Sequence, residues 1–252
     1  MRAIAAELLA RGHGVRVVGP QCRRQSYESL GACFEAYEHA PEHDAGARET
    51  DIVRDWEART PLGAFARMRD NLMFGPAVAF AREVDAAVKR ERPAAAVIDY
   101  MLTGAAAGAR RAGVPTAGLV HNVYPLPAAG VPPFGMGLAP ARGKAGRLRD
   151  HVLGRVALRP FAVGLDTLNG VRRELGLPEV AHLGALLDDF AVVLVAVPPE
   201  FDLAARASLP PAVTFVGNMV PPASEQPWQG PWPSDDPRPL VLVSLSTTFM
   251  DQ

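Results

Sequence analysis

Two polar side chains close apolar segments of strand length, at positions where they could do chemistry. Asp99 ends "AAAVID", and His121 ends "TAGLVH" just before a long loop. Open α/β sheets bind ligands beyond the carboxyl ends of their strands, and an imidazole can exchange a proton near neutral pH. Each residue also has a purely structural interpretation. Asp99 can cap a helix that begins near Thr103, and His121 can hydrogen-bond at the end of its strand.

Other polar clusters carry weaker signals. His39, His43 and Asp44 are residue types that ligate metals, but Pro41 lies between the histidines and disfavours helical spacing. We therefore expect a solvated loop and no metal site. A basic run contains Arg142, Lys144, Arg147 and Arg149 without interleaved aromatic residues, which predicts a solvated helix face rather than a surface for nucleic acid.

Composition and charge exclude several classes of protein. The chain has 252 residues, of which 48% are hydrophobic and 21% charged, as in ordinary globular proteins. Its net charge of -1 gives no overall attraction to nucleic acid or to anionic membranes. Two cysteines cannot form a zinc quartet or a disulfide framework, so a reducing cytoplasm is expected. No apolar stretch approaches the roughly 20 residues of a membrane span, so we expect a soluble protein without stable membrane insertion.

Helix and strand patterns alternate along most of the chain. Apolar residues at helical spacing predict helices over 2–11, over 62–90 with a kink or division at Pro76, over the small-residue segment after Thr103, and over 145–175 in two pieces around Pro160. Strands are predicted in "GVRVVGP", near 32–37, in "AAAVIDYM", "TAGLVH", "LDDFAVVLVAV" and "AVTFVGNM", and a long loop over 122–143. The alternation predicts a Rossmann-like parallel sheet with helices on both faces.

The order of these elements and several local strings resemble the GT-B glycosyltransferases. "AAELLARGHGVRVVGP", "AAAVIDYMLTGAAAGARRAGVPTAGLVH", "FVGNM" and "PLVLVSLSTTF" look like the amino-terminal half of the UDP-glycosyltransferase superfamily, in its macrolide and natural-product branch. The resemblance covers essentially the whole chain. It implies two Rossmann-like domains, of which the first binds a hydrophobic small-molecule acceptor and the second a UDP- or TDP-hexose. The implied reaction is inverting hexosyl transfer without a bound cofactor.

The resemblance also assigns roles to particular residues. Asp99 matches the family's aspartate that orients a histidine base, since a carboxylate fixes the imidazole tautomer and stabilises the imidazolium. That base would lie upstream of Met1, and His13 is not its counterpart because it belongs to the "ARGH" turn. Ser246 and Thr247 match a loop near the donor phosphates.

By position, four residues are candidates for contact with the acceptor. They are His121, Phe74, Tyr124 and Phe134. Phe74 follows Met68, Leu72 and Met73 at helical spacing, and residues in that pattern are more often part of a core than of a pocket.

The resemblance divides the chain into three parts. Residues 1–218 would form the acceptor-binding domain without its first strand, 219–239 a proline-rich interdomain linker, and 240–252 the first strand of a truncated nucleotide-sugar-binding domain. A sheet without its first strand has an open edge, so we expect self-association and little activity from these residues alone.

Three other functions stay open at this point. A non-catalytic binding or auxiliary protein could keep the fold without the chemistry. A sugar-nucleotide epimerase could share the GT-B architecture. An NAD(P)-dependent Rossmann oxidoreductase is disfavoured because no glycine fingerprint follows a predicted strand, and "GMGLAP" follows a proline-rich loop instead.

Overall fold

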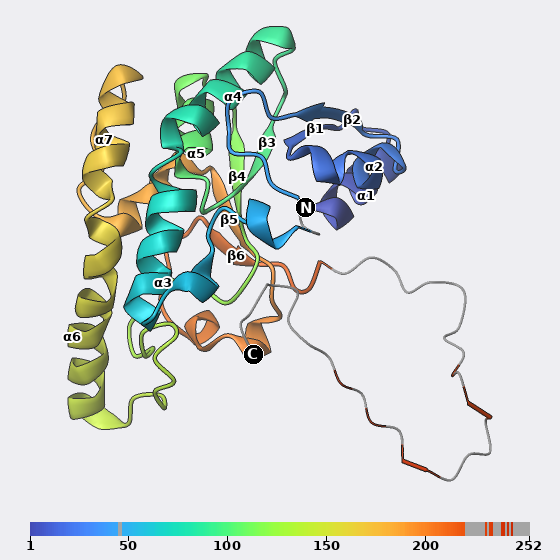
Figure 1. Cartoon of the computed structure of the whole chain (residues 1–252). Helices are drawn as coiled ribbons and strands as arrows, with labels where there is room; N and C mark the ends of the chain where they lie inside the picture. The colour runs from blue at the N-terminus through green and yellow to red at the C-terminus, as the bar shows by residue number, and fades with distance from the viewer. Residues whose placement is uncertain are drawn as a thin grey trace.

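The computed structural model describes residues 1–44 and 47–219, together with isolated residues at 230, 232, 233, 238, 239, 241 and 243 (Figure 1). In chain order its main elements are α1 (Arg2–Ala10), β1 (Arg16–Gly19), α2 (Arg24–Glu28), β2 (Cys33–Ala36), α3 (Pro61–Met68), α4 (Ala77–Arg90), β3 (Ala96–Asp99), α5 (Thr103–Arg111), β4 (Thr116–Val120), α6 (Gly143–Ala162), α7 (Leu165–Glu174), β5 (Val192–Val195) and β6 (Val213–Phe215). The predicted linker at 219–239 and the strand at 240–252 lie almost entirely outside these described residues.

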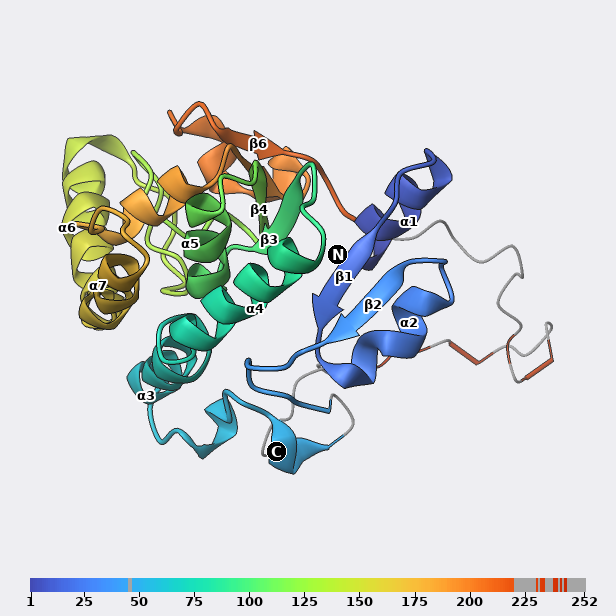
Figure 2. The ribbon, with the colours of Figure 1, turned by 90° about the horizontal axis from the view of Figure 1, so that it is seen from above.

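The strands form two parallel sheets. One contains β1 and β2, and the other has the order β3-β4-β5-β6. In Figures 1 and 2 the two-stranded sheet lies on the β3 side of the larger one. The strand order therefore reverses between β1 and β3: β2 follows β1 on one side, and β4 to β6 follow β3 on the other. The expected parallel α/β architecture is confirmed, although the hydrogen-bonded strands form two separate sheets.

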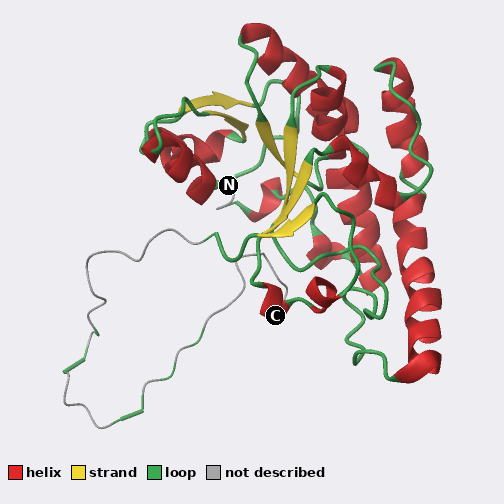
Figure 3. Ribbon diagram, turned by 180° about the vertical axis from the view of Figure 1, so that it is seen from behind, coloured by secondary structure: helices red, strands yellow, loops and turns green. Residues whose placement is uncertain are grey.

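Helices cover opposite faces of these strands. In Figure 2, α1 and α2 lie on one side of β1–β2, and α4 and α5 lie on the other side, against the four-stranded sheet. Figure 3 shows α6 and α7 beyond them, on the outside of the molecule. None of the described helices is both long and apolar enough to cross a bilayer.

Small residues allow α5 to pack closely against α4. A Cβ atom at Gly104 would lie 2.0 Å from the carbonyl oxygen of Ala77, and one at Gly108 would lie 3.1 Å from that of Ala81. The small residues of "TGAAAGA" are therefore explained by close contact between α4 and α5 as much as by helix propensity.

The helical region before β3 is divided, as predicted, at Pro76. α3 runs into a π-helical turn at Arg69–Met73, and Pro76 is the N-cap of α4. The second predicted division is displaced. α6 continues through Pro160 to Ala162, and the break before α7 comes at Gly164, where a Cβ atom would lie 2.2 Å from the ring of Phe74. The close approach of the Phe74 ring therefore requires glycine at position 164. The short helix α2 also forms within the predicted polar connection.

A buried carboxylate joins the smaller sheet to the rest of the fold. Glu83 in α4 accepts hydrogen bonds at Oε1 from the backbone N–H groups of Glu38 and Ala40, at 2.7 and 2.8 Å, and from that of His39 between them. These three residues come directly after β2. Because a two-stranded sheet has little independent stability, this attachment helps to hold β1–β2 in place.

Candidate functional site

The structure brings together the two polar residues at the ends of β3 and β4. Asp99 is the last residue of β3 and lies opposite Leu119 in the parallel ladder. His121 is two residues beyond Leu119, so the alternation of side chains along a strand places it on the same side as Asp99. His121 Nδ1 lies 3.1 Å from Asp99 Oδ2. The sequence located both residues at strand ends but did not predict that they pair.

The second carboxylate oxygen of Asp99 serves the local backbone. Oδ1 accepts a hydrogen bond of 3.0 Å from the N–H of Met101. The N-cap of α5 is Leu102, and it receives no side-chain capping bond. The capping interpretation is therefore wrong, because Asp99 fixes the turn after β3 and leaves Oδ2 for His121.

The electrostatic environment of His121 favours its charged form. The hydrogen bond to Asp99 raises the pKa of His121 above its usual 6.5, while partial burial and the nearby amino terminus of Met1 act in the opposite direction. The imidazole is half exposed. Because Nδ1 donates to the carboxylate, Nε2 is left to accept a proton from a ligand.

Tyr100 and Asn122, one residue beyond each member of the pair, complete the site. The rings of Tyr100 and His121 are 6.0 Å apart between centroids. Burial, with the Asp99 charge, raises the pKa of Tyr100 to about 12, and its side chain hydrogen-bonds to Asn122. Asn122 Oδ1 is buried and has no hydrogen-bond partner within the described structure. A buried acceptor of this kind is costly unless a ligand or solvent donor reaches it.

Sequence reasoning missed these two neighbours. Their one available signal was adjacency to Asp99 and His121, and adjacency does not reveal which way a side chain points.

The other predicted site residues lie elsewhere. Phe74 and Tyr124 are only 1% and 6% exposed and belong to the hydrophobic core, so neither side chain is open to an acceptor. Phe134 is 48% exposed in the loop after β4. Ser246 and Thr247 lie outside the described residues.

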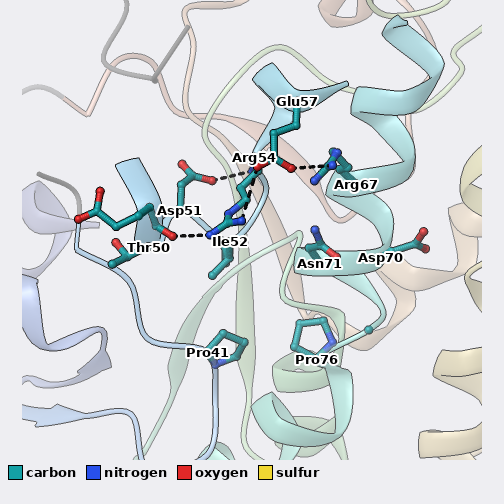
Figure 4. A pocket seen from close by; sticks show the side chains of 12 residues that line it. Pro41, Thr50, Asp51, Ile52, Arg54, Glu57, Arg67, Asp70, Asn71 and Pro76 are labelled. Carbon is teal, nitrogen blue, oxygen red and sulfur yellow. Dashed lines mark hydrogen bonds and ion pairs between the residues drawn. The ribbon is translucent and has the colours of Figure 1, made fainter. Parts of the chain in front are cut away.

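A polar hollow of about 520 Å³ opens between the loop after β2 and the π-helical turn (Figure 4). Arg54 and Arg67 both contact Glu57, at 3.5 and 2.7 Å, and Asp51 accepts the backbone N–H of Arg54 at 2.9 Å. Asn71 and Pro76 lie across the hollow from this cluster. Asp99 and His121 are not among its lining residues. The charged groups largely compensate one another, so this hollow offers polar contacts rather than an acid–base centre.

Comparison with known proteins gives relatives of one kind. The sequence is 29% identical over 262 aligned residues to 4'-demethylrebeccamycin synthase of Lentzea aerocolonigenes, an alignment that covers 100% of this chain and 60% of that protein. The chain therefore spans less than two thirds of its relative. No protein-family model matches it. Among solved structures, the glycotransferase of kitacinnamycin superimposes with a TM-score of 0.61 at 17% identity, over 91% of this chain and 50% of the other.

The chain is similar to GT-B natural-product glycosyltransferases, and it has the fold of their amino-terminal half. The rhamnosyltransferase of spinosyn, solved with thymidine diphosphate, has the same fold at a TM-score of 0.51 and 14% identity, over 85% of this chain and 45% of its own. The expected resemblance to these glycosyltransferases and the fold of their amino-terminal half are confirmed. In this GT-B half, Asp99 and His121 stand at the carboxyl edge of the sheet, beside the point where the strand order reverses. That is where open α/β folds place their ligands.

The contact between Asp99 and His121 predicts a measurable titration. Replacing Asp99 with asparagine should lower the pKa of His121, because the charge-assisted hydrogen bond that raises it is lost. The folded-state pKa lies above the unfolded one, so the contact stabilises the fold fully below the unfolded pKa. This stabilisation is lost as the pH rises through the folded pKa. NMR titration of the His121 ring tests this, with Asp166→Asn on the exposed side of α7 as control. An unchanged His121 titration in Asp99→Asn would show that the pair does not form.

Proposed function

We propose that this chain is the acceptor-binding half of an inverting, nucleotide-sugar-dependent glycosyltransferase that transfers a hexose to a hydrophobic, hydroxylated natural product. The observation that carries the proposal is the Asp99–His121 pair, with a separation of 3.1 Å between Nδ1 and Oδ2, at the carboxyl edge of the sheet. The natural product named for its relative, 4'-demethylrebeccamycin, supports an acceptor of this class.

In the proposed reaction His121, rather than the histidine that the resemblance implied upstream of Met1, accepts the proton of the acceptor hydroxyl. Asp99 holds Nδ1–H and so leaves Nε2 free to take that proton. The acceptor oxygen forms a bond to the anomeric carbon of the sugar, and the bond from that carbon to the diphosphate oxygen breaks. The nucleoside diphosphate leaves with the electron pair, and the anomeric configuration inverts. Asp99 stabilises the imidazolium that forms.

The acceptor would lie along the carboxyl edge of the strands. The polar hollow follows β2 and the catalytic pair follows β3 and β4, and the strands are parallel within each of the two sheets. Asn122 Oδ1, which is buried without a partner among the described residues, would accept a hydrogen bond from a second acceptor hydroxyl. This arrangement gives a polar end to a site whose walls are partly apolar.

The donor would be held mainly by a second domain. We assign 219–239 to the linker and 240–252 to the first strand of that domain, with Ser246 and Thr247 near the donor phosphates. Thymidine diphosphate bound to a protein of the same fold supports a nucleotide-sugar donor, and both UDP- and TDP-hexose are consistent with it. We place the reaction in the cytoplasm. The edges of β1 and β3 that face each other carry no ladder among the described strands, which supports self-association of these residues in isolation.

The decisive experiment separates catalysis from acceptor binding. The chain is fused at residue 252 to the nucleotide-binding half of a solved relative and assayed with hydroxylated aromatic acceptors and TDP- or UDP-hexose. We expect His121→Asn to lower kcat about 10²-fold or more while KM for the acceptor changes little, because a general base acts in the transition state. Asn122→Ala should mainly raise KM.

His182→Asn serves as the matched control. His182 caps a short helix through its Nδ1, 3.2 Å from the N–H of Ala185, away from Asp99. If His121→Asn and the control retain equal turnover, His121 is not the base. If the fusion binds acceptors but transfers no sugar to any of them, the alternative of a non-catalytic binding protein takes the place of the enzyme.

A further inference from the structure

The outer face of α6 carries two parallel rows of exposed side chains. A basic ridge contains Arg147, His151, Arg155 and Arg159, each four residues after the last. An apolar ridge beside it contains Leu148, Val152 and Val156, which are 64%, 49% and 43% exposed. Residues four apart lie on one side of a helix, so each ridge is continuous. From Leu148 to Val156 the apolar ridge extends for about 12 Å.

The charges of the basic ridge are not compensated within the fold. The one acidic residue of α6 is Asp150, which is buried and contacts Arg149 at 2.7 Å. Arg147, Arg155 and Arg159 make no ion pair or hydrogen bond to another side chain in the described ranges, 1–44 and 47–219. A chain with a net charge of -1 therefore concentrates unpaired positive charge on one helix.

The position of α6 leaves this face free. Figures 1 and 2 place α6 at the edge of the molecule, with its outer side turned away from the four-stranded sheet. The loop after β4 packs along a neighbouring side of the helix, since Arg149 Nη2 donates to the carbonyl oxygen of Ala139 at 2.8 Å. A Cβ atom at Gly154 would lie 3.3 Å from Pro127 of the same loop. This loop exposes two more large apolar side chains, those of Phe134 and Met136.

We propose that the outer face of α6 docks on an anionic lipid bilayer. In this orientation the helix lies in the plane of the interface, with the apolar ridge among the upper acyl chains and the arginines against the phosphates. Long arginine side chains can reach the headgroups while their aliphatic parts stay beside the apolar ridge. The inference does not depend on the proposed glycosyl transfer.

The asymmetry of the face favours a membrane over an acidic protein. Protein interfaces have an apolar centre surrounded by a polar rim. On α6 the charged ridge and the apolar ridge lie side by side along the length of the helix. Such a division suits a planar boundary between charged headgroups and hydrocarbon, and Phe134 beside it is a residue type common at that boundary.

Vesicle flotation tests the proposal with the full chain. Vesicles of equal parts phosphatidylglycerol and phosphatidylcholine should carry the protein, and vesicles of phosphatidylcholine alone should not. We expect Arg147→Gln, Arg155→Gln and Arg159→Gln together to lower the partition coefficient about 100-fold, because each arginine near an anionic surface contributes a factor of about five. Replacing the same three arginines with lysine should retain binding. Val152→Ser with Val156→Ser should weaken binding to the vesicles that contain phosphatidylglycerol.

A triple variant of equal charge change is the control. Arg23, Arg82 and Arg206 are exposed outside α6, and their replacement with glutamine should leave flotation unchanged. Thermal melts and circular dichroism verify that each variant is folded. Equal loss in both triple variants, or no preference for phosphatidylglycerol in the unmodified chain, would overturn the proposal. A third result would also overturn the proposal. If the chain does not bind the vesicles but binds a helical peptide with glutamates at four-residue spacing, α6 is a protein-binding surface.

Discussion

Replacing Arg172 with alanine should lower the free energy of unfolding by about 3–5 kcal/mol, because it leaves a buried carboxylate without its main partner. Arg172 Nη1 lies 2.5 Å from Asp189 Oδ2, and the two side chains are 3% and 2% exposed. Arg172 Nε also donates to the carbonyl oxygen of Pro178 at 2.7 Å. The remaining partner of Asp189 is Arg110, at 3.0 Å, whose side chain is 38% exposed.

The neighbouring residue provides a matched control. Arg173 contacts Glu179 at the same distance, 2.5 Å, but the two side chains are 63% and 56% exposed. Arg173→Ala should therefore cost less than about 1 kcal/mol. The double variant Arg172→Met with Asp189→Leu should recover most of the loss, since both buried charges are removed together. Urea unfolding measures all three variants, and equal losses for Arg172→Ala and Arg173→Ala would contradict the interpretation.

Replacing Glu83 with alanine should have an effect of similar size for a different reason. Its carboxylate accepts the backbone N–H groups of Glu38, His39 and Ala40, and its side chain lies in the interior. Each buried N–H left without a partner costs about 1–3 kcal/mol, so the total should reach about 3 kcal/mol or more. We expect β1 and β2 to detach before the rest of the chain unfolds, because a two-stranded sheet is marginal by itself.

Hydrogen exchange distinguishes this local opening from general destabilisation. In Glu83→Ala, amides of β1 and β2 should exchange much faster than those of β4 and β5. Glu83→Gln is the matched variant, because its amide oxygen can still accept the three hydrogen bonds, and it should lose less stability. Uniform acceleration across both sheets would show that Glu83 stabilises the whole fold rather than the attachment of β1–β2.

Much of the local structure could be predicted from the sequence. The apolar segments of β1, β4 and β5 have strand length and end at Gly, Pro or polar residues, and each forms a parallel strand. Gly113 follows the helix before β4 with a positive φ of 64°, a conformation that favours glycine at a helix end. The division at Pro76 was equally local, since proline restricts its own backbone wherever it occurs.

Packing decided what local patterns could not. The break between α6 and α7 lies at Gly164 rather than at Pro160, and the ring of Phe74 occupies the space of a Cβ atom at that glycine. Phe74 is a residue type that is common in ligand pockets, but in the structure it is buried in the core. The contact between Phe74 and Gly164 joins residues ninety positions apart. No short segment of the sequence can therefore reveal the position of the break or the burial of Phe74.

For the site, local sequence patterns predicted that Asp99 and His121 stand at strand ends, and the resemblance to GT-B glycosyltransferases predicted the fold. That the two residues face each other follows from the folded chain alone. Strand register sets that contact, and register depends on how whole strands pair across the sheet. The same holds for the buried Oδ1 of Asn122 and for the bare outer face of α6, because burial and exposure are properties of the assembled fold.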